Sequence, residues 1–561
     1  MDLEPQYDGG PGKKTVKKPA SVGSVSVRLI RADKTVDTAM RSENKFHESP
    51  SETGRLFVGQ SPSIPPPWAS FVREAAGTTA DVELQNKSCG AVLFLTAGRV
   101  GKPNRIFAFT FGTGHLALDP DAIERGFGLK VTLNKVERSK LRTLDVASLD
   151  ATVIQRRTQA SRDIDIDEFG LNKHQDLLRL AAGTPDDTGL ARTLSGRDSL
   201  TLNRRYSATE LKALCKRLLT LYEGKEYQKH YKFIDNVRPV QDRLLLSALD
   251  GLAFAEIKAL VGGQTSDVYL SLPEILDPSR SLEVSYLGAT LKPGRKSVYP
   301  DVDIADYVQE LRLGKVADLT LDAWRTTHEI RFSEAGETDR EKHHRIHSCL
   351  VWEVVHNGIT YVAFGGEWFA IDKLFYKEIE DDFRRLVSVT PVVASTAAKN
   401  EQELLVELDA RPDLLLMDKT KTNPRGAPRA NIEFCDFLGA DRKLIHLKDG
   451  HASTSISHLW SQGVVGSESF LRDEGFRRHL LKHVRTRQKD ANKSGFDKLL
   501  PTPAKRPTTR DFTVTYGIMR TPLKRSGKLD IPFFSKVSLR AAAQRLQDLG
   551  FNVEVQLIKM T

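Results

Sequence analysis

The sequence has few cysteines and no long apolar segment. Four cysteines are spread along 561 residues, at Cys89, Cys215, Cys349 and Cys435. Because none is paired by spacing, they argue against a zinc site or a disulfide framework, and we expect a protein of a reducing cytoplasm. No apolar run approaches the roughly 18–20 residues that span a bilayer, and the N-terminus lacks the apolar core of a secretory signal. We therefore expect no membrane partner.

A strong charge bias is also lacking. The hydrophobic fraction of 40% and the charged fraction of 28% are ordinary for a soluble globular protein. The net charge of +10 indicates an acidic partner only where the positive charge is concentrated. The length exceeds that of one compact domain and predicts three.

The pattern of apolar residues predicts an α+β multidomain protein, with mixed strands in its first two domains. A Gly-, Pro- and Lys-rich tail covers residues 1–22, and an α+β domain of short strands covers residues 23–205. Its expected strands include Ile106–Phe111 and Leu129–Leu133. Residues 206–395 form a helical domain that closes with a β-meander, in which Asn357-Gly358 is a strong hairpin signal. Residues 396–561 form the C-terminal domain.

The strongest candidate site lies in residues 431–463. Glu433 and Asp436 lie on one apolar segment, and His446 and Lys448 lie on the next, after a short polar turn. Carboxylates on one strand of a hairpin and a lysine on the next are the groups that a metal-dependent phosphodiesterase needs. Magnesium takes hard oxygen ligands, and a lysine can hold the attacking water or offset charge on the phosphate. The pattern predicts a Mg²⁺ or Mn²⁺ site with Glu433 and Asp436 as ligands.

The order of elements around this site resembles a known nuclease core. A helix is expected first, then three strands, further helices and a fourth strand, over residues 400–519. This α-β-β-β-α-β order resembles the PD-(D/E)xK restriction-endonuclease-like superfamily, which implies a C-terminal α/β domain with endonuclease chemistry. The resemblance implies a metal-binding role for Asp436, a catalytic role for Lys448, a helix carboxylate at Glu403 or Glu407, and a polar residue on the following helix at Gln462.

One residue departs from that superfamily. The pattern has Glu, Asp or Gln two residues before the lysine, where this chain has His446. Histidine is a poorer partner for magnesium than a carboxylate. Either the site is reorganised around Glu433, with His446 as an extra ligand or proton carrier, or the fold binds nucleic acid without cutting it.

The register of the hairpin decides which carboxylate joins Lys448. A four-residue loop would pair Leu438 with Lys443 and place Glu433 opposite Lys448. A loop one residue longer would place Asp436 opposite His446. The sequence leaves both registers open.

A basic helix over residues 468–490 supports a nucleic-acid partner. Eleven Lys or Arg and only two Asp lie in residues 477–510. Phe476, Leu480 and Val484 fall on one face of the helix, and a cationic stripe falls on the other. Such a stripe suits phosphate contacts. Its members are Arg478, Lys482, Arg485 and Lys489.

Nearly the whole chain also resembles a family of sporadically distributed bacterial proteins of unknown function. The matching segments include FTFGTGH at 109–115, IEFCDF at 432–437, SHLWSQG at 457–463 and IPFFSK at 531–536. The patchy distribution implies a cytoplasmic bacterial protein of anti-phage or mobile-element defence, with a possible protein partner from a defence operon. The resemblance supplies no activity.

Two hypotheses follow. The first is a metal-dependent nuclease that acts on DNA, with RNA as a second substrate class. The alternative is a non-catalytic nucleic-acid-binding or scaffold protein that retains a nuclease-like fold.

Overall fold

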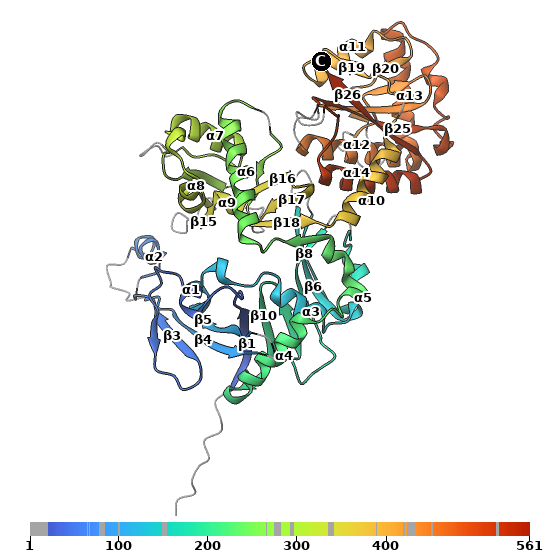
Figure 1. Ribbon diagram of the computed structural model, residues 1–561. Helices are drawn as coiled ribbons and strands as arrows, with labels where there is room; N and C mark the ends of the chain where they lie inside the picture. Colours follow the sequence, from blue (N-terminus) through green and yellow to red (C-terminus); the bar gives the residue numbers. More distant parts are fainter. Residues whose placement is uncertain are drawn as a thin grey trace, which may run out of the picture. The chain divides into compact units, whose positions relative to one another are not determined.

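The chain is a mixed α and β protein with large antiparallel sheets (Figure 1). The computed structural model describes residues 21–63, 65–66, 68–77, 85–98, 101, 103–148, 154–173, 176–264, 266–273, 282–291, 297–334, 342–388, 390–418, 421–422, 432–449, 453–522 and 527–561. The chain divides into two compact units. Unit 1 comprises residues 1–145, 157–170 and 179–231, and unit 2 comprises residues 146–156, 171–178 and 232–561. The predicted middle and C-terminal domains thus lie in one unit.

Unit 1 is built on a ten-stranded sheet whose last strands cross the unit boundary. The strand order is β2 (His47–Ser49), β3 (Arg55–Gln60), β4 (Cys89–Ala97), β5 (Arg105–Gly112), β1 (Ser21–Leu29), β10 (Ser199–Ser207), β9 (Thr193–Gly196), β8 (Asp176–Gly183), β6 (Leu141–Ser148) and β7 (Ile154–Ile164). Its helices are α1 (Val36–Ala39), α2 (Ala69–Ala75), α3 (Phe127–Leu133), α4 (Leu211–Glu223) and α5 (Gln228–Tyr231). The predicted strand Ile106–Phe111 is confirmed within β5.

The predicted strand Leu129–Leu133 is wrong, because these residues belong to helix α3. Gly126 starts the helix with φ +66°, a conformation that suits glycine. Phe127 and Val131, one turn apart, are buried together against the sheet. A side chain at Gly128 would meet the backbone oxygen of Ser199 in β10 at 2.0 Å, so the helix lies directly on the sheet. Tertiary packing overrides the local strand preference here.

The first part of unit 2 contains the predicted meander. Its five-stranded sheet has the order β11 (Val237–Pro239), β18 (Glu367–Ile371), β17 (Ile359–Phe364), β16 (Leu350–His356) and β12 (Tyr269–Leu270). Asn357 and Gly358, both at positive φ, join β16 to β17 as a two-residue turn, which confirms the hairpin. A smaller sheet is formed by β13 (Leu282–Leu287), β14 (Glu329–Glu334) and β15 (Lys342–Arg345). The helices are α6 (Arg243–Val261), α7 (Ile304–Leu313), α8 (Leu321–Thr327), α9 (Ile346–Cys349) and α10 (Lys373–Leu386).

The C-terminal part of unit 2 is a three-layer arrangement around a six-stranded sheet (Figure 1). The order is β19 (Ser395–Thr396), β26 (Asn552–Met560), β25 (Thr513–Arg520), β24 (Lys443–Asp449), β23 (Phe437–Gly439) and β20 (Leu414–Leu416), with β21 (Lys421–Thr422) and β22 (Ile432–Glu433) as a separate pair. Strands β24, β25, β26 and β19 run parallel, whereas β20 and β23 run antiparallel to their neighbours.

Different helices pack on the two faces of this sheet. Helix α11 (Glu401–Asp409) packs Leu404 and Leu408 against Leu447 on one face. The helices α12 (Ser453–Arg472), α13 (Glu474–Asp490) and α14 (Phe533–Asp548) cover the other, where Leu444 and Tyr516 lie. The observed succession is α11, β20, β21, β22, β23, β24, α12, α13 and β25, so the short pair β21–β22 is present in addition to the three strands predicted before α12. Among the described residues, no helix has the length and apolar content that crossing a membrane requires.

Candidate functional site

The start of α11 holds the two predicted helix carboxylates away from the candidate site. The side chain of Asn400 caps the helix by accepting the N–H of Glu403, and Asn400 donates back to the Glu403 carboxylate at 3.1 Å. The Glu407 carboxylate accepts the hydroxyl of Thr396 at 2.5 Å. Both glutamates therefore secure the helix and its neighbouring strand, and neither pairs with Lys448.

A different residue of α11 reaches the site. The carboxylate of Glu401, the first residue of the helix, lies 2.8 Å from the Nζ of Lys448 at the end of β24. Both side chains are about 30% exposed (31% for Lys448 and 29% for Glu401), so the pair is open to solvent and to a substrate. Glu401 was not among the predicted site residues, although its place in the first turn of the helix is the signal that could have identified it.

The β23–β24 hairpin adopts the longer of the two predicted loops. Phe437 pairs with Ile445 and Leu438 with Leu444, and the same register places Asp436 opposite His446. The backbone of Asp436 accordingly donates its N–H to the carbonyl of Ile445. The Asp436 carboxylate accepts the N–H of Leu447 at 2.6 Å, one residue before Lys448. Asp436 is therefore fixed beside the end of β24.

Glu433 approaches the site from a separate short strand pair. Its strand, β22, pairs with β21, and its carboxylate accepts a weak hydrogen bond of 3.4 Å from the side-chain amide of Gln462 on α12. Gln462 thus lies where the element order predicted a polar residue of the following helix. It contacts a carboxylate through its amide group.

The carboxylates repel one another. Burial raises the pKa of Asp436 to about 7, and the charges of Glu401, Asp418 and Glu433 add to the rise, while the hydrogen bond from Leu447 opposes it. Asp418 follows β20 and was not predicted as a site residue. The four acidic side chains come from α11, β22 and the ends of β20 and β23, so the fold gathers negative charge at one end of the sheet.

These residues are of the chemical types that bind a divalent metal. Carboxylate oxygens are the ligands that Mg²⁺ and Mn²⁺ take, and their mutual repulsion is what a bound cation would relieve. Among the residues that the structure describes, no three His, Cys, Asp or Glu side chains are already gathered as a metal site. A bound metal would therefore require these carboxylates to turn toward a common point.

The predicted role of His446 as ligand or proton carrier does not agree with its surroundings. Its side chain is 2% exposed and packs 5.7 Å, centroid to centroid, from the ring of Tyr516. Burial lowers the pKa of His446 to about 4, so the ring is neutral at physiological pH. Among the described residues, its Nε2 atom has no hydrogen-bond partner. His446 therefore packs in the core under α12, and Lys448 two residues later is the first side chain on that face to reach solvent.

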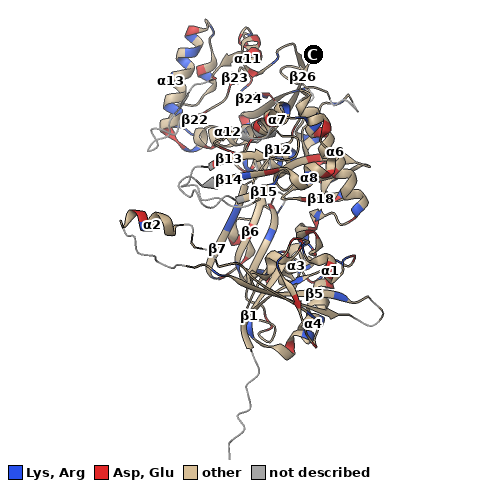
Figure 2. Cartoon of the chain, turned by 90° about the vertical axis from the view of Figure 1, so that its left-hand side faces the viewer, with Lys and Arg blue, Asp and Glu red and all other residues tan. Residues whose placement is uncertain are grey.

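Helix α13 has the predicted two faces. Phe476, Leu480 and Val484 are buried, and Figure 2 shows Lys and Arg positions recurring along the helix. All four predicted cationic residues are exposed. Arg478 pairs with Glu474 at 2.6 Å, and Arg485 pairs with Asp497 at 3.4 Å.

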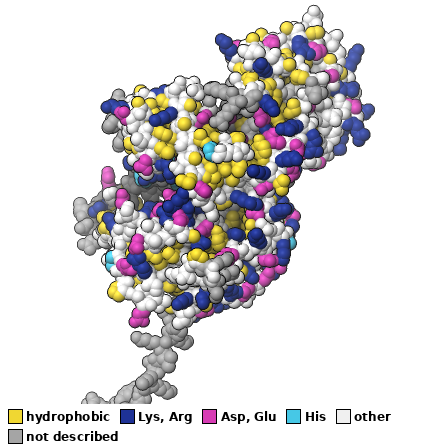
Figure 3. Space-filling model, in the orientation of Figure 1, with side chains coloured by type: hydrophobic (Ala, Val, Ile, Leu, Met, Phe, Trp, Pro, Cys, Tyr) yellow, Lys and Arg dark blue, Asp and Glu magenta, His cyan; other side chains and the backbone are white. Residues whose placement is uncertain are grey.

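The two lysines of the stripe are less neutralised. Within the described part of the chain, neither Lys482 nor Lys489 forms an ion pair. Elsewhere, basic and acidic side chains are interspersed on the face of each unit that Figure 3 shows. Among the predicted residues, Lys482 and Lys489 of α13 are therefore the best-supported candidates for contacts with phosphate groups.

The chain belongs to the family of unknown function DUF6119, whose family model matches residues 23–559. The predicted membership of a family of unknown function over nearly the whole chain is thus confirmed. No curated protein and no solved structure matches the chain. The resemblance of residues 400–519 to a restriction-endonuclease core therefore has no support from these comparisons and stays a prediction from the sequence.

Proposed function

We propose that the C-terminal part of unit 2 hydrolyses phosphodiester bonds of nucleic acid with a divalent metal, with DNA as the first substrate class and RNA as the second. The observation that supports this most is the convergence of Glu401, Asp436 and Lys448 at one end of the sheet. A helix and two adjacent strands supply these groups, and the lysine is ion-paired at 2.8 Å yet open to solvent. This placement provides metal-ligand oxygens beside a cation that a phosphate can approach.

The proposed roles follow from the contacts. Asp436, Glu401 and Glu433 would hold Mg²⁺ or Mn²⁺, which when bound would polarise the phosphate and lower the pKa of a bound water. Lys448 would exchange its contact with Glu401 for the phosphate oxygen or the attacking water. Gln462 would orient Glu433 through the hydrogen bond that it already makes. His446 would support β24 by packing.

Helix α13 supports nucleic acid as the substrate. The guanidinium of Arg487, in its last turns, donates to the backbone oxygen of Asp418 at 3.1 Å. This contact joins α13 to the acidic end of the sheet, while Lys482 and Lys489 stay exposed. A backbone that follows these lysines would therefore be held close to the proposed site.

The alternative is a nucleic-acid-binding or scaffold protein without catalysis. It is favoured by His446, which occupies a carboxylate position of the PD-(D/E)xK pattern and is buried. Both proposals use α13, and only the first uses Lys448. A role in anti-phage or mobile-element defence, a protein partner from a defence operon and a cytoplasmic location stay predictions from resemblance.

Lys448→Ala distinguishes the two proposals. Purified full-length protein is incubated with single-stranded DNA, double-stranded DNA and RNA, with Mg²⁺ or Mn²⁺, and products are resolved on denaturing gels. We expect cleavage by the wild type, a loss of at least about 100-fold in Lys448→Ala, and unchanged binding in a mobility-shift assay. Lys443→Ala is the matched control, because Lys443 lies at the other end of β24 and pairs with Glu554 at 3.1 Å.

Absence of cleavage by the wild type on every substrate would contradict the catalytic proposal, as would equal cleavage by Lys448→Ala. Binding is tested separately with Lys482→Glu/Lys489→Glu. For two lost contacts to duplex DNA, we expect the slope of log affinity against log salt to fall by about 1.8. An unchanged slope would contradict the assignment of α13 as the nucleic-acid surface.

A further inference from the structure

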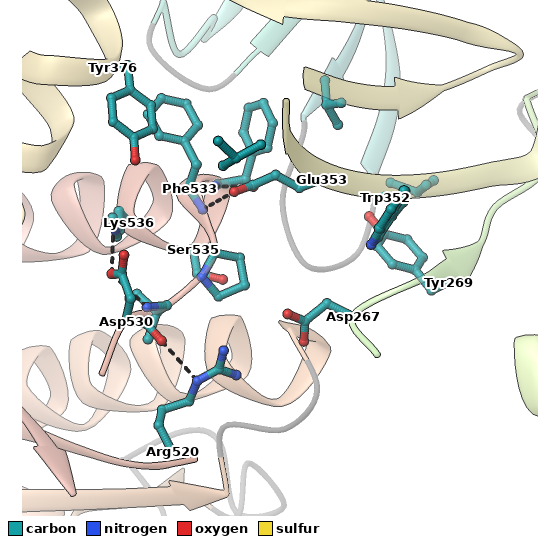
Figure 4. A pocket seen from close by; sticks show the side chains of 16 residues that line it. Asp267, Tyr269, Trp352, Glu353, Tyr376, Arg520, Asp530, Phe533, Ser535 and Lys536 are labelled. Atoms are coloured by element: carbon teal, nitrogen blue, oxygen red, sulfur yellow. Dashed lines mark hydrogen bonds and ion pairs between the residues drawn. The ribbon is translucent and has the colours of Figure 1, made fainter. Parts of the chain in front are cut away.

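A cavity lies in unit 2 where the meander contacts the start of α14 (Figure 4). Its volume is about 200 Å³, and its walls come from β12, β16, β17, α10, the end of β25 and the segment that leads into α14. No residue of the proposed phosphodiesterase site lines it. An apolar cavity of about 150 Å³ can hold benzene, so this cavity has room for roughly six to eight non-hydrogen atoms.

Glu353 of β16 brings a negative charge to the wall of this cavity. Its two oxygens accept the backbone N–H groups of Phe533 and Phe534, at 2.8 and 3.4 Å. Among the described residues, no cation forms an ion pair with this carboxylate. Burial raises the pKa of Glu353 to about 7, the charge of Asp267 adds to the rise, and the two N–H groups and Lys536 oppose it. A cation in the cavity would therefore stabilise the ionised carboxylate.

The side chains around the cavity carry an excess of negative charge. The charged residues of the lining are Asp267, Glu353, Asp530, Arg520 and Lys536. The ammonium of Lys536 is shared between Asp530, at 2.8 Å, and Glu380, which does not line the cavity. The guanidinium of Arg520 donates to the backbone oxygen of Asp530 at 2.9 Å. With Glu380 included, there are four carboxylates to two cations, and this balance favours a positively charged ligand.

A buried hydroxyl in the wall has no hydrogen bond. Ser535, the third residue of α14, lines the cavity and is 1% exposed. Among the described residues, its Oγ atom has no hydrogen-bond partner. A buried hydroxyl without a partner is unfavourable, and a ligand with an N–H group would provide one. This observation is independent of the charges and indicates a ligand that donates hydrogen bonds.

Aromatic and aliphatic side chains form most of the remaining lining. The rings of Tyr269, Trp352 and Tyr376 belong to it, as do the side chains of Val351 and Val362. In the view of Figure 4, Tyr376 lies on the opposite side of the cavity from Trp352 and Tyr269. The faces of aromatic rings attract organic cations. The apolar part of the lining favours a ligand that carries an alkyl chain beside its charge.

We propose that this cavity binds a small aliphatic primary amine, whose ammonium group donates to Ser535 and lies beside the charges of Glu353 and Asp267. The alkyl chain would contact the aromatic rings and the valines of the lining. A primary ammonium is a compact charge with three N–H donors, which suits a lining with acidic groups and an unused hydroxyl. The site is separate from the proposed phosphodiesterase site and does not depend on its activity.

Three other kinds of cation fit this lining less well. A guanidinium pairs best with a carboxylate that offers both oxygens, whereas those of Glu353 already accept the N–H groups of α14. A quaternary ammonium has no N–H group for Ser535. A divalent metal needs several oxygen ligands around one point. Within the described part of the chain, no three His, Cys, Asp or Glu side chains are gathered in that way.

Isothermal titration calorimetry of the full-length protein tests the proposal. The probe is pentylamine, and the comparison compounds are 1-pentanol, tetramethylammonium, methylguanidine and Mg²⁺. 1-Pentanol has the same chain without the charge, and tetramethylammonium has a charge without N–H donors. We expect saturable binding of pentylamine that is at least about tenfold tighter than that of each comparison compound.

Two variants locate the binding. Ser535→Ala removes a hydroxyl that forms no hydrogen bond among the described residues, so it should fold, and we expect the affinity to fall about three- to tenfold. Glu353→Gln removes the charge and keeps an oxygen for one N–H of α14, and we expect a fall of at least about tenfold. Glu378→Gln is the control, because it removes an exposed carboxylate that pairs with Arg540 outside the cavity.

Affinity for pentylamine that falls in Ser535→Ala and Glu353→Gln, and is retained in Glu378→Gln, supports the amine site. Where Glu353→Gln does not fold, Ser535→Ala alone decides. Unchanged affinity in Ser535→Ala overturns the proposal, as does binding of 1-pentanol, tetramethylammonium, methylguanidine or Mg²⁺ as tight as that of pentylamine. Absence of saturable binding of pentylamine at millimolar concentration also overturns it, whatever the cleavage assay shows.

Discussion

Replacing Asp436 with asparagine should stabilise the protein at alkaline pH. The pKa of Asp436 is raised to about 7 in the folded chain, from 3.8, by burial and by the charges of Glu401, Asp418 and Glu433. The folded state therefore binds the proton more tightly than the unfolded state, and stability falls as pH rises from about 4 to about 7. Above pH 7 the ionised carboxylate is a net cost that asparagine does not have.

The magnitude follows from the size of the shift. A rise of about 3 units, at about 1.4 kcal/mol per unit, gives an upper bound of about 4 kcal/mol. Because Asp436 is only partly buried, solvent screening reduces this, and we expect about 2 kcal/mol. The hydrogen bond from Leu447 does not change the balance, since the amide oxygen of asparagine can accept it.

Urea unfolding followed by circular dichroism at pH 3.5 and pH 8 measures the effect. Asp436→Asn should match the wild type at pH 3.5, where the carboxyl is mostly protonated in both states, and exceed its free energy of unfolding by about 2 kcal/mol at pH 8. Asp413→Asn is the control of opposite sign, because the guanidinium of Arg411 lowers the pKa of Asp413. A variant Asp436→Asn that is less stable than the wild type at pH 8, or equally affected at both values, would refute the reasoning.

Three further predictions use the same unit. In differential scanning fluorimetry at pH 7, manganese should raise the melting temperature of the wild type and leave that of Asp436→Asn nearly unchanged. At a manganese concentration of ten times Kd, the expected gain in the free energy of unfolding is about 1.4 kcal/mol. An equal rise in both proteins would contradict a metal site at Asp436. Gly463→Ala should cost about 1–3 kcal/mol in urea unfolding, because its Cβ would meet the hydroxyl of Tyr516 at 2.2 Å; a neutral effect would contradict this close packing. Lys536→Met should lower stability by about 3–5 kcal/mol, since it leaves Glu380 and Asp530 without their buried cation; Lys377→Met, at an exposed position of α10, should be neutral in the same assay.

The sequence was most informative where a local pattern of residues determines both the secondary structure and which side chains are buried. Helix α13 was predicted with its buried and exposed faces because Phe476, Leu480 and Val484 recur at helical spacing beside charged residues. The β16–β17 hairpin was predicted because Asn357-Gly358 suits positive φ at both positions. In both cases the signal lies within a few residues, and distant contacts need not be known.

The site was predicted only in part, because its geometry depends on contacts between distant segments. Spacing alone could not tell Glu401 from Glu403 and Glu407, which lie on the same short helix. The position of α11 on the sheet decides which glutamate contacts Lys448, because it brings the first turn of the helix to this lysine. The register of β23 against β24 likewise depends on the length of the loop between them. His446 is buried and Lys448 is partly exposed because α12 covers the strand at His446.

Asp436 offers a physical reason to prefer the catalytic proposal over the binding one. The charges of three other carboxylates add to the rise in its pKa, and the nearby cation, Lys448, is paired with Glu401 at 2.8 Å. A surface that only bound phosphates would gain from fewer acidic groups at this end of the sheet, since they repel the ligand. An acidic cluster that lowers stability beside a solvent-accessible lysine is instead typical of a site that holds a cation during catalysis. The pH-dependent stability of Asp436→Asn and its response to manganese therefore test this preference before any substrate is known.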